Sequence, residues 1–175
     1  MTKFVVGGSL NISGPRTTEA DNPADFGELI RTIAQPLYTT AGSAALNVAP
    51  STSDTINIIP ANSLILSAHF YTQTAFTSTT TATGIDVGLY KASDGTTAID
   101  ANGLIVVGTE GAKAALTANS WNVGSGALIG VESGAFDAII DGAWAAGTDT
   151  LTGTGVIVVR FIPPLDAILG PNDAS

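Results

Sequence analysis

The sequence predicts an all-β protein, an antiparallel β-sandwich of about eight strands, jelly-roll-like, with an N-terminal arm. From Pro36 onward, short runs rich in Val, Ile, Thr and aromatic residues alternate with Gly, Asn, Asp and Pro, which is the pattern of a sandwich or barrel. Long helical periods are few, and strands do not alternate with helices, which argues against a parallel α/β fold. A jelly roll is a common arrangement of eight antiparallel strands in two sheets.

Residues 1–35 differ in composition from the rest of the chain. They hold seven of the 21 charged side chains (15 acidic and 6 basic) and show little of the alternation expected of strands. We therefore expect an N-terminal arm at residues 1–35 and a β-sandwich domain at residues 36–175. Two interpretations of the arm remain open: it becomes ordered on a neighbouring molecule, or it wraps its own domain.

Short apolar runs between turn-forming residues predict where the strands of the domain lie. We expect strands at residues 35–39, 44–48, 55–59, 64–76, 85–91, 104–107, 128–132 and 156–162. Residues 60–63 ("PANS") and 93–97 ("SDGTT") have the composition of turns, and residues 77–84 ("TSTTTATG") that of an exposed polar loop. Two segments are ambiguous: residues 109–121 allow a helical turn, and residues 135–147 allow a strand or an irregular segment that buries Phe136, Ile139 and Trp144.

The strand predicted at residues 64–76 carries the only histidine of the chain. Its even-numbered residues are mostly apolar and should face the core, because successive side chains alternate across a strand. The outer face then carries Ile65, His69 and Tyr71. Apolar and aromatic side chains beside a histidine on an outward face indicate a subunit interface, with an ordinary surface strand as the alternative.

Arg160 lies in "GVIVVRFIPP", a run that is apolar on both faces of the predicted strand. A strand of this kind is central in its sheet or covered by a partner. A buried arginine requires a carboxylate or carbonyl partner. We therefore expect a structural or intersubunit salt bridge, and the candidates for the oligomer interface are Ile65, His69, Tyr71 and Arg160.

The composition favours a protein that associates with other proteins. Charged residues make up only 12% of the chain and hydrophobic residues 45%. Permanent interfaces are more apolar than ordinary surface, so a homo-oligomer is expected, the alternative being a β-domain with an uncharged polar surface. The net charge is −9 and the six basic residues are scattered, which argues against binding to nucleic acid or to an anionic membrane. We find neither a membrane-spanning apolar run nor the apolar core of a signal peptide.

The sequence offers little for catalysis or for metal binding. It contains no cysteine and one histidine, which excludes the common zinc sites, and it lacks both a GxSxG nucleophile motif and a phosphate-binding loop. Asp94 and Asp100 miss the spacing of an EF-hand and are expected to form turns. Asp137 and Asp141 lie near Trp144, which allows a sugar-binding platform, but a tryptophan in so aromatic-poor a chain is expected in the core, and so is Trp121. We therefore expect no enzyme, catalytic residue, metal or cofactor.

Three segments resemble small β-sandwich proteins of tailed-bacteriophage virions. They are "RTIAQPLYTTAGSAALNVAPSTSDTINIIPANSLILSAHFYTQTAF", "GIDVGLYKASDGTTAIDANGLI" and "GTGVIVVRFIPP". The sequence is most similar to head decoration (cement) proteins, over roughly residues 31–163. The resemblance lies in the pattern of residues along the strands and includes no catalytic signature.

This resemblance implies a jelly-roll homotrimer on the outer surface of the capsid, made in the host cytoplasm. Its partners would be the major capsid protein and its own copies, and it would stabilise the joints between capsid subunits. The arm residues that would contact the capsid are Phe4, Phe26 and Arg31. The alternative is a fibre or tail module that binds a host glycan through residues 77–84 or 135–144, with an exposed tryptophan beside carboxylates in a groove. A small glycosidase or esterase is a third alternative.

Overall fold

The computed structural model describes residues 29–39, 45–47, 57–78, 83–145 and 151–164, and this part of the chain is all β. Its eight strands are β1 (Arg31–Thr39), β2 (Ala45–Asn47), β3 (Leu64–Ser78), β4 (Gly84–Lys91), β5 (Ala98–Ile105), β6 (Ser120–Val123), β7 (Ala138–Ala145) and β8 (Leu151–Ile162).

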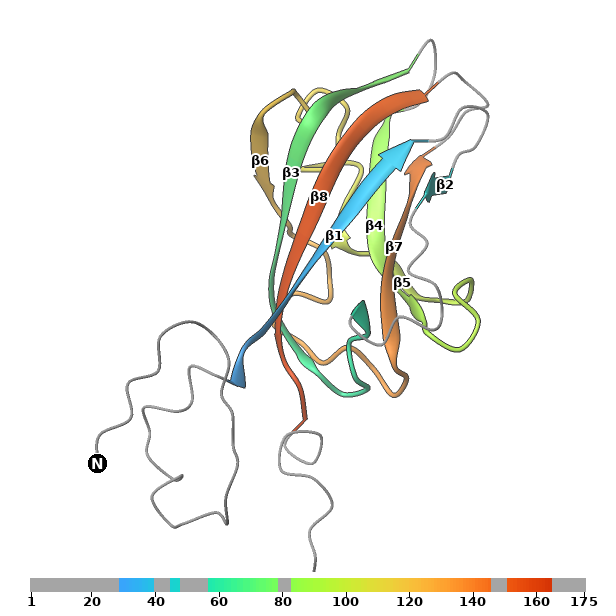
Figure 1. Ribbon diagram of the computed structural model, residues 1–175, viewed down its shortest axis with the longest axis vertical. Coiled ribbons are helices and arrows are strands. Elements are labelled where there is room, and N and C mark those ends of the chain that lie inside the picture. Colours follow the sequence, from blue (N-terminus) through green and yellow to red (C-terminus); the bar gives the residue numbers. More distant parts are fainter. Residues whose placement is uncertain (1–28, 40–44, 48–56, 79–82, 146–150, 165–175) are drawn as a thin grey trace, which may run out of the picture.

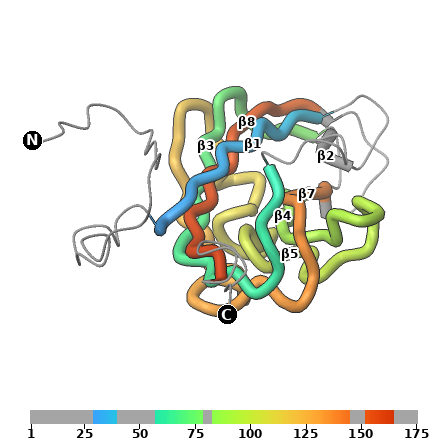
Figure 2. Tube along the Cα trace, turned by 60° about the horizontal axis from the view of Figure 1, so that its bottom comes forward, coloured from blue at the N-terminus to red at the C-terminus, as the bar shows by residue number. Residues whose placement is uncertain are grey.

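The strands form one hydrogen-bonded sheet in the order β5-β4-β7-β2-β1-β8-β3-β6, and every pair is antiparallel. The sheet folds over itself into two layers (Figures 1 and 2), with β6, β3, β8 and β1 in one layer and β7, β4 and β5 in the other. The short strand β2 connects them, pairing with β1 on one side and with β7 on the other. Strands distant in sequence are thus neighbours in both layers, and the expected jelly-roll-like antiparallel sandwich is confirmed.

The hydrophobic core fills the space between the two layers. Aromatic rings connect the layers: Phe70 packs against Phe76, and Phe76 against Trp144 of the opposite layer, with 5.7 Å between ring centroids in each pair. Around them lie the inward-facing aliphatic side chains of both layers, among them Ile33, Leu37, Ile157 and Val159 on one side and Ile85, Val87, Leu89 and Ile140 on the other. Alternate residues of these strands face away from the core.

A β-bulge in β3 reverses part of the predicted side-chain pattern. The register shifts between Ile65, opposite Phe161, and Ser67, opposite Arg160, which leaves Leu66 as an extra residue. As a result Ile65 and Ala68 both face inward. Ile65 has 0% of its surface exposed, so its predicted place on the outer face is wrong.

The start of the domain also differs from the prediction. Residues 31–35, which we assigned to the arm, form the first half of β1 and pair with β8. The alternation there was hard to recognise because the inward position between Ile33 and Leu37 is occupied by Gln35, while Ala34 and Pro36 face outward. Residues 1–28 lie outside the described residues.

Four of the predicted strands match β1, β3, β4 and β8, and β2 covers part of a fifth. The turns at residues 60–63 and 93–97 are confirmed: Ser63 N–H bonds to the carbonyl of Pro60, and the Asp94 carboxylate accepts bonds from two following amides. The strand expected at residues 104–107 ends at Ile105 and begins earlier, as β5. Residues 128–132 form turns and not a strand, and only Glu132 makes an isolated bridge, to Leu64.

The two ambiguous segments each contain a strand. Residues 109–121 form successive turns that lead into β6, a strand that we did not predict. Within residues 135–147 the strand is β7, which buries Ile139 and Trp144 as expected. Phe136 is 51% exposed, so its predicted burial is wrong. It precedes β7 and packs against the Lys91 ammonium, which lies 3.9 Å from the ring centroid. Of the strand expected at residues 55–59, only Ile59 forms a bridge, and residues 55–56 are not described.

Candidate protein–protein interface

The solvent side of the β6-β3-β8-β1 layer presents two adjacent rows of uncharged side chains. Because paired residues of antiparallel strands point to the same side, the register defines each row. One row consists of Val123, His69, Val158 and Ala34, and the other of Trp121, Tyr71, Val156 and Pro36. One residue pair further along lie Arg160 and Thr32. We call the surface formed by these ten side chains the outer face.

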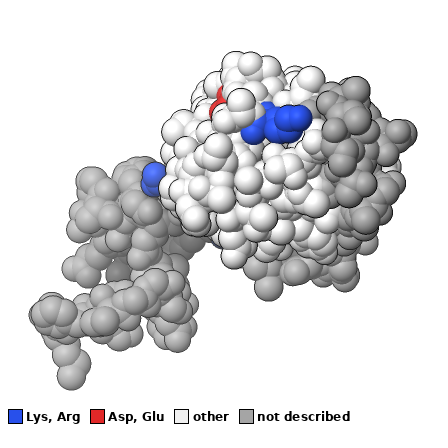
Figure 3. Space-filling model, turned by 90° about the horizontal axis from the view of Figure 1, so that it is seen from above, with Lys and Arg blue, Asp and Glu red and all other residues white. Residues whose placement is uncertain are grey.

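The carboxylates carried by the strands all lie in one of the two layers. The four strands that carry the outer face contain two charged residues, Arg31 and Arg160, and no carboxylate. The strands of the other layer contain Asp86, Lys91, Asp100 and Asp141. Seen from above (Figure 3), most of the described surface is neither acidic nor basic. A wide and largely apolar sheet face without a carboxylate is typical of a surface that contacts another protein.

Trp121 and Tyr71 form an aromatic pair at one margin of the outer face. Their ring centroids are 5.0 Å apart, and the Tyr71 hydroxyl donates a hydrogen bond of 3.1 Å to the side-chain oxygen of Asn119. Trp121 is 60% exposed, so its predicted place in the core is wrong, whereas Trp144 is 4% exposed, as predicted. The reason is that β6 is an edge strand whose Asn122 and Ser120 pair with inward-facing residues of β3, which turns Trp121 and Val123 outward.

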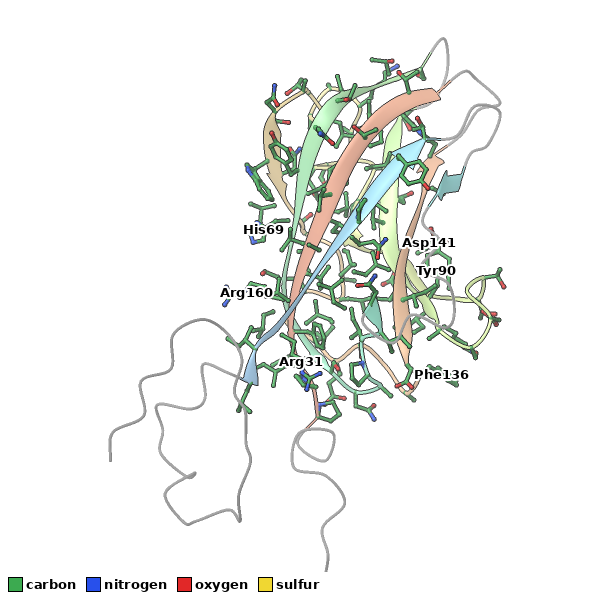
Figure 4. All side chains as sticks on the ribbon, viewed as in Figure 1. Arg31, His69, Tyr90, Phe136, Asp141 and Arg160 are labelled. Carbon is green, nitrogen blue, oxygen red and sulfur yellow. The ribbon has the colours of Figure 1, made fainter. Side chains whose placement is uncertain are left out.

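His69 is half-buried in the middle of this face, between Val123 and Val158 on the neighbouring strands. Figure 4 shows His69 and Arg160 on the same side of the molecule, away from Tyr90 and Asp141. No hydrogen bond joins His69 to a serine or an aspartate among the described residues, so its surroundings there are those of a surface contact and not of a catalytic triad.

Arg160 lies on a central strand, as predicted, because β8 pairs with both β1 and β3. Its side chain is nevertheless exposed, and it makes no ion pair with another described residue. The structural salt bridge that we expected within the chain is therefore absent from the described part. Arg31 is exposed at the start of β1, and Phe4 and Phe26 lie outside the described residues.

The carboxylates proposed for a sugar platform do not converge on a tryptophan. Trp144 points into the core, whereas Asp141 lies on the opposite side of β7, across from Gly88 of β4. Burial raises the pKa of Asp141 to about 6, against the opposing effect of a 2.7 Å hydrogen bond from the amide of Gly142. Burial also raises the pKa of Tyr90, and the nearby charges of Asp141 and Asp86 raise it further. Asp137 accepts a hydrogen bond from the amide of Ala61.

The remaining acidic side chains discussed for metal binding organise their own loops. Asp94 accepts bonds from Thr97 and from the amide of Thr96, and these hydrogen bonds, first of all that from the Thr97 hydroxyl, lower its pKa to about 2. Asp100 accepts a bond from the amide of Asn102. No cluster of three potential ligands occurs among the residues that the structure describes.

Glu110 ties two loops together. Its carboxylate accepts bonds from the amides of Val106 and Ser125 and from the Ser125 hydroxyl. Burial acts to raise the pKa of Glu110, but the hydrogen bonds from Thr109 and Ser125 outweigh it, so the pKa lies below its usual value. The Glu110 carboxylate is therefore held by hydrogen bonds that connect the two loops.

Comparisons with known proteins bear on the fold. No protein-family model matches the sequence, and no curated protein matches it significantly. Two solved structures are similar in fold. One is described as the capsid of Ralstonia phage GP4, at 13% identity and a TM-score of 0.49, over 77% of this chain and 84% of that chain. The other is described as the cyanophage Pam1 capsid asymmetric unit, at 15% identity and a TM-score of 0.44, over 77% and 85%. In the described residues, no helix has both the length and the apolar character needed to cross a bilayer.

Sequence reasoning identified His69, Tyr71 and Arg160 on this face but missed most of their neighbours. Trp121 and Val123 belong to a strand of only four residues, too short for a periodic signal. Ala34 and Pro36 fell in or beside the predicted arm. One pattern in the sequence could have indicated this face. In the 12-residue strand β8, the outward side chains of Val156 and Val158 are apolar, which predicts apolar side chains beside them on the neighbouring strands.

Proposed function

We propose that this chain is a structural protein of a bacteriophage virion, a capsid decoration (cement) subunit. It binds the outer surface of the capsid as a homotrimer, stabilises the joints between major capsid protein subunits, and catalyses no reaction. The observation that carries the proposal is the outer face, which spans four strands without a carboxylate and exposes an aromatic pair. Such a face loses little by desolvation and is suited to burial against protein. The resemblance of residues 31–163 to decoration proteins suggests that the partners are the major capsid protein and other copies of this chain.

The proposed role follows from linked binding. A subunit that bridges two capsid proteins must be released before they separate, so its binding free energy adds to the stability of the joint. A trimer makes three equal contacts at once, and each bound contact raises the effective concentration of the next. Individually weak contacts then suffice. In this proposal the outer face serves the contacts between copies, and the N-terminal residues Phe4, Phe26 and Arg31 serve those with the capsid.

The test is binding to capsids that lack decoration protein. We expect the purified chain to bind them saturably and to raise the temperature at which they release packaged DNA. A chain shortened to begin at residue 29 keeps the described β1 with Arg31 and is expected to bind at least tenfold more weakly, because the contacts of Phe4 and Phe26 are gone. The proposal is contradicted if the full chain binds no capsid, or binds without any change in the release temperature.

One observation favours a second candidate, a fibre or tail module that binds a host glycan. Trp121 and Tyr71 form an exposed aromatic surface beside the Asn119 amide, and sugars stack on surfaces of this kind. Carboxylates, expected beside such a tryptophan, are absent from β3 and β6. Under this alternative, added oligosaccharide shifts the fluorescence emission of Trp121. Under the decoration proposal, the emission is unchanged.

A further inference from the structure

The margin of the outer face at β6 is an open edge. β6 is the last strand of its layer and pairs with β3 alone. The amide of Gly124 bonds to the carbonyl of Ala68, so residues 120, 122 and 124 direct their peptide groups toward β3. Trp121 and Val123 therefore direct theirs away from the sheet, and both side chains are exposed, at 60% and 64%. Neither a charge nor a proline lies on this short edge strand, so its outward peptide groups are open to pairing with another chain.

A carboxylate completes this margin at its far end. Glu132 forms a bridge with Leu64, which in turn pairs with Ile162. Glu132 is therefore level with Ile162, two residues from Arg160 along the strand direction, a separation of about 7 Å. Both Glu132 and Arg160 are exposed, and neither makes an ion pair with another described residue. We call Trp121, Val123 and Glu132 the β6 margin.

Along the strand direction, each residue of the β6 margin has a counterpart at a similar position on the β8–β1 half of the outer face. Trp121 is level with Val156 and Pro36, and Val123 is level with Val158 and Ala34. Glu132, level with Ile162, lies about 7 Å beyond the level of Arg160. A closed trimer requires a contact between two different surfaces of the same chain. Rotation about an axis parallel to the strands leaves the position of each residue along that axis unchanged. Residues at the same position along the axis in one copy can therefore contact each other between neighbouring copies.

We propose that the β6 margin of one copy packs on the β8–β1 half of the outer face of the next copy, and that Glu132 pairs with Arg160 across this contact. The inference rests on the proposed homotrimer and names the surfaces that form it. Charge supports a second copy as the occupant. Two chains of net charge −9 repel each other, and this contact instead brings the carboxylate of Glu132 to Arg160 on a layer whose strands carry no carboxylate.

Charge reversal tests the contact. Arg160→Glu and Glu132→Arg each place like charges across every contact of the ring, and we expect each variant to need at least a tenfold higher concentration to form trimers. The double variant restores opposite charges and is expected to assemble like the wild type. Mixing the two single variants is expected to give a heavier species than either alone, which a pair within one chain would not produce. Lys91→Glu, on the other layer, is the control and is expected to keep the wild-type mass.

Light scattering measures the outcome, and thermal unfolding confirms that each variant is folded. If the wild type is a trimer and both single variants remain trimers at the same concentrations, the proposed contact is wrong while the decoration function stands. The same holds if the double variant fails to recover. If the wild type is monomeric yet binds capsids, the contact and the trimer are wrong, and capsid binding stands. If the wild type neither assembles nor binds capsids, the proposed function fails with it.

Discussion

Asp141 is a residue whose acid–base chemistry is changed by its place in the fold. It lies on the outward side of β7, where Gly88 of the adjacent strand supplies no side chain. A Cβ added at Gly88 would lie only 1.9 Å from the carbonyl oxygen of Asp100, so the backbone of β5 passes close to Gly88. Burial of the Asp141 side chain accounts for its carboxyl pKa of about 6.

The raised pKa of Asp141 predicts a pH dependence of stability. Because the folded state binds this proton more tightly than the unfolded state, the stabilisation is complete below pH 4 and is lost as the pH rises through 6. The side chain is partly exposed, so solvent screening reduces the effect to about 1 kcal/mol. Asp141→Asn keeps an oxygen for the Gly142 amide and loses the titration.

Urea unfolding at pH 5.5 and pH 7.5 measures this effect. The wild type is expected to lose more stability than Asp141→Asn between the two pH values, and the difference between the proteins isolates this residue from the other carboxylates. Equal losses in both proteins would show that Asp141 has the same pKa in the folded and unfolded states.

At the scale of the element, the bulge in β3 decides which side chains reach the core. It places Ile65 beneath the segment at residues 130–131, through hydrogen bonds from the Ile65 amide to Val131 and from the Gly130 amide to Ile65. Leu66 is the extra residue and remains partly exposed. A strand without the bulge would bury Leu66 and expose Ile65.

Two neighbouring truncations distinguish these arrangements. Ile65→Ala is expected to cost about 2–5 kcal/mol of unfolding free energy, because it empties a fully enclosed site. Leu66→Ala is expected to cost about 1 kcal/mol or less, since its side chain is only partly buried. Chemical denaturation of both variants measures the costs, and the reverse order would mean that β3 continues without a bulge.

The bulge also shows what could be read from the sequence and what could not. The fold class and the long strands β3, β4 and β8 were predictable, since apolar alternation over many residues reflects burial between two layers. Which side chains of β3 face the core was not predictable, because a bulge of one residue produces no recognisable pattern in the sequence. Trp121 was misplaced for a related reason: hydrophobicity predicts burial, but a four-residue edge strand exposes whichever side chains its register turns outward.

For the whole molecule, the main feature is the separation of charge between the two layers. The chain carries nine excess negative charges, yet the four strands of one layer contribute none of its carboxylates. Net charge keeps copies apart in most orientations and so favours those in which the layer without carboxylates is buried. The sequence could predict a low charge but not its segregation, because the strand order β1-β8-β3-β6 joins segments that are far apart in the chain.

The solution mass of the purified chain, measured by light scattering over a hundredfold range of concentration, tests the central claim that the outer face is a protein–protein interface. We expect a stable species of three times the 17.5 kDa of one chain. We also expect Val158→Asp, which places a carboxylate in the middle of the outer face, to lower that mass. A wild type that remains at 17.5 kDa at every concentration would contradict the claim.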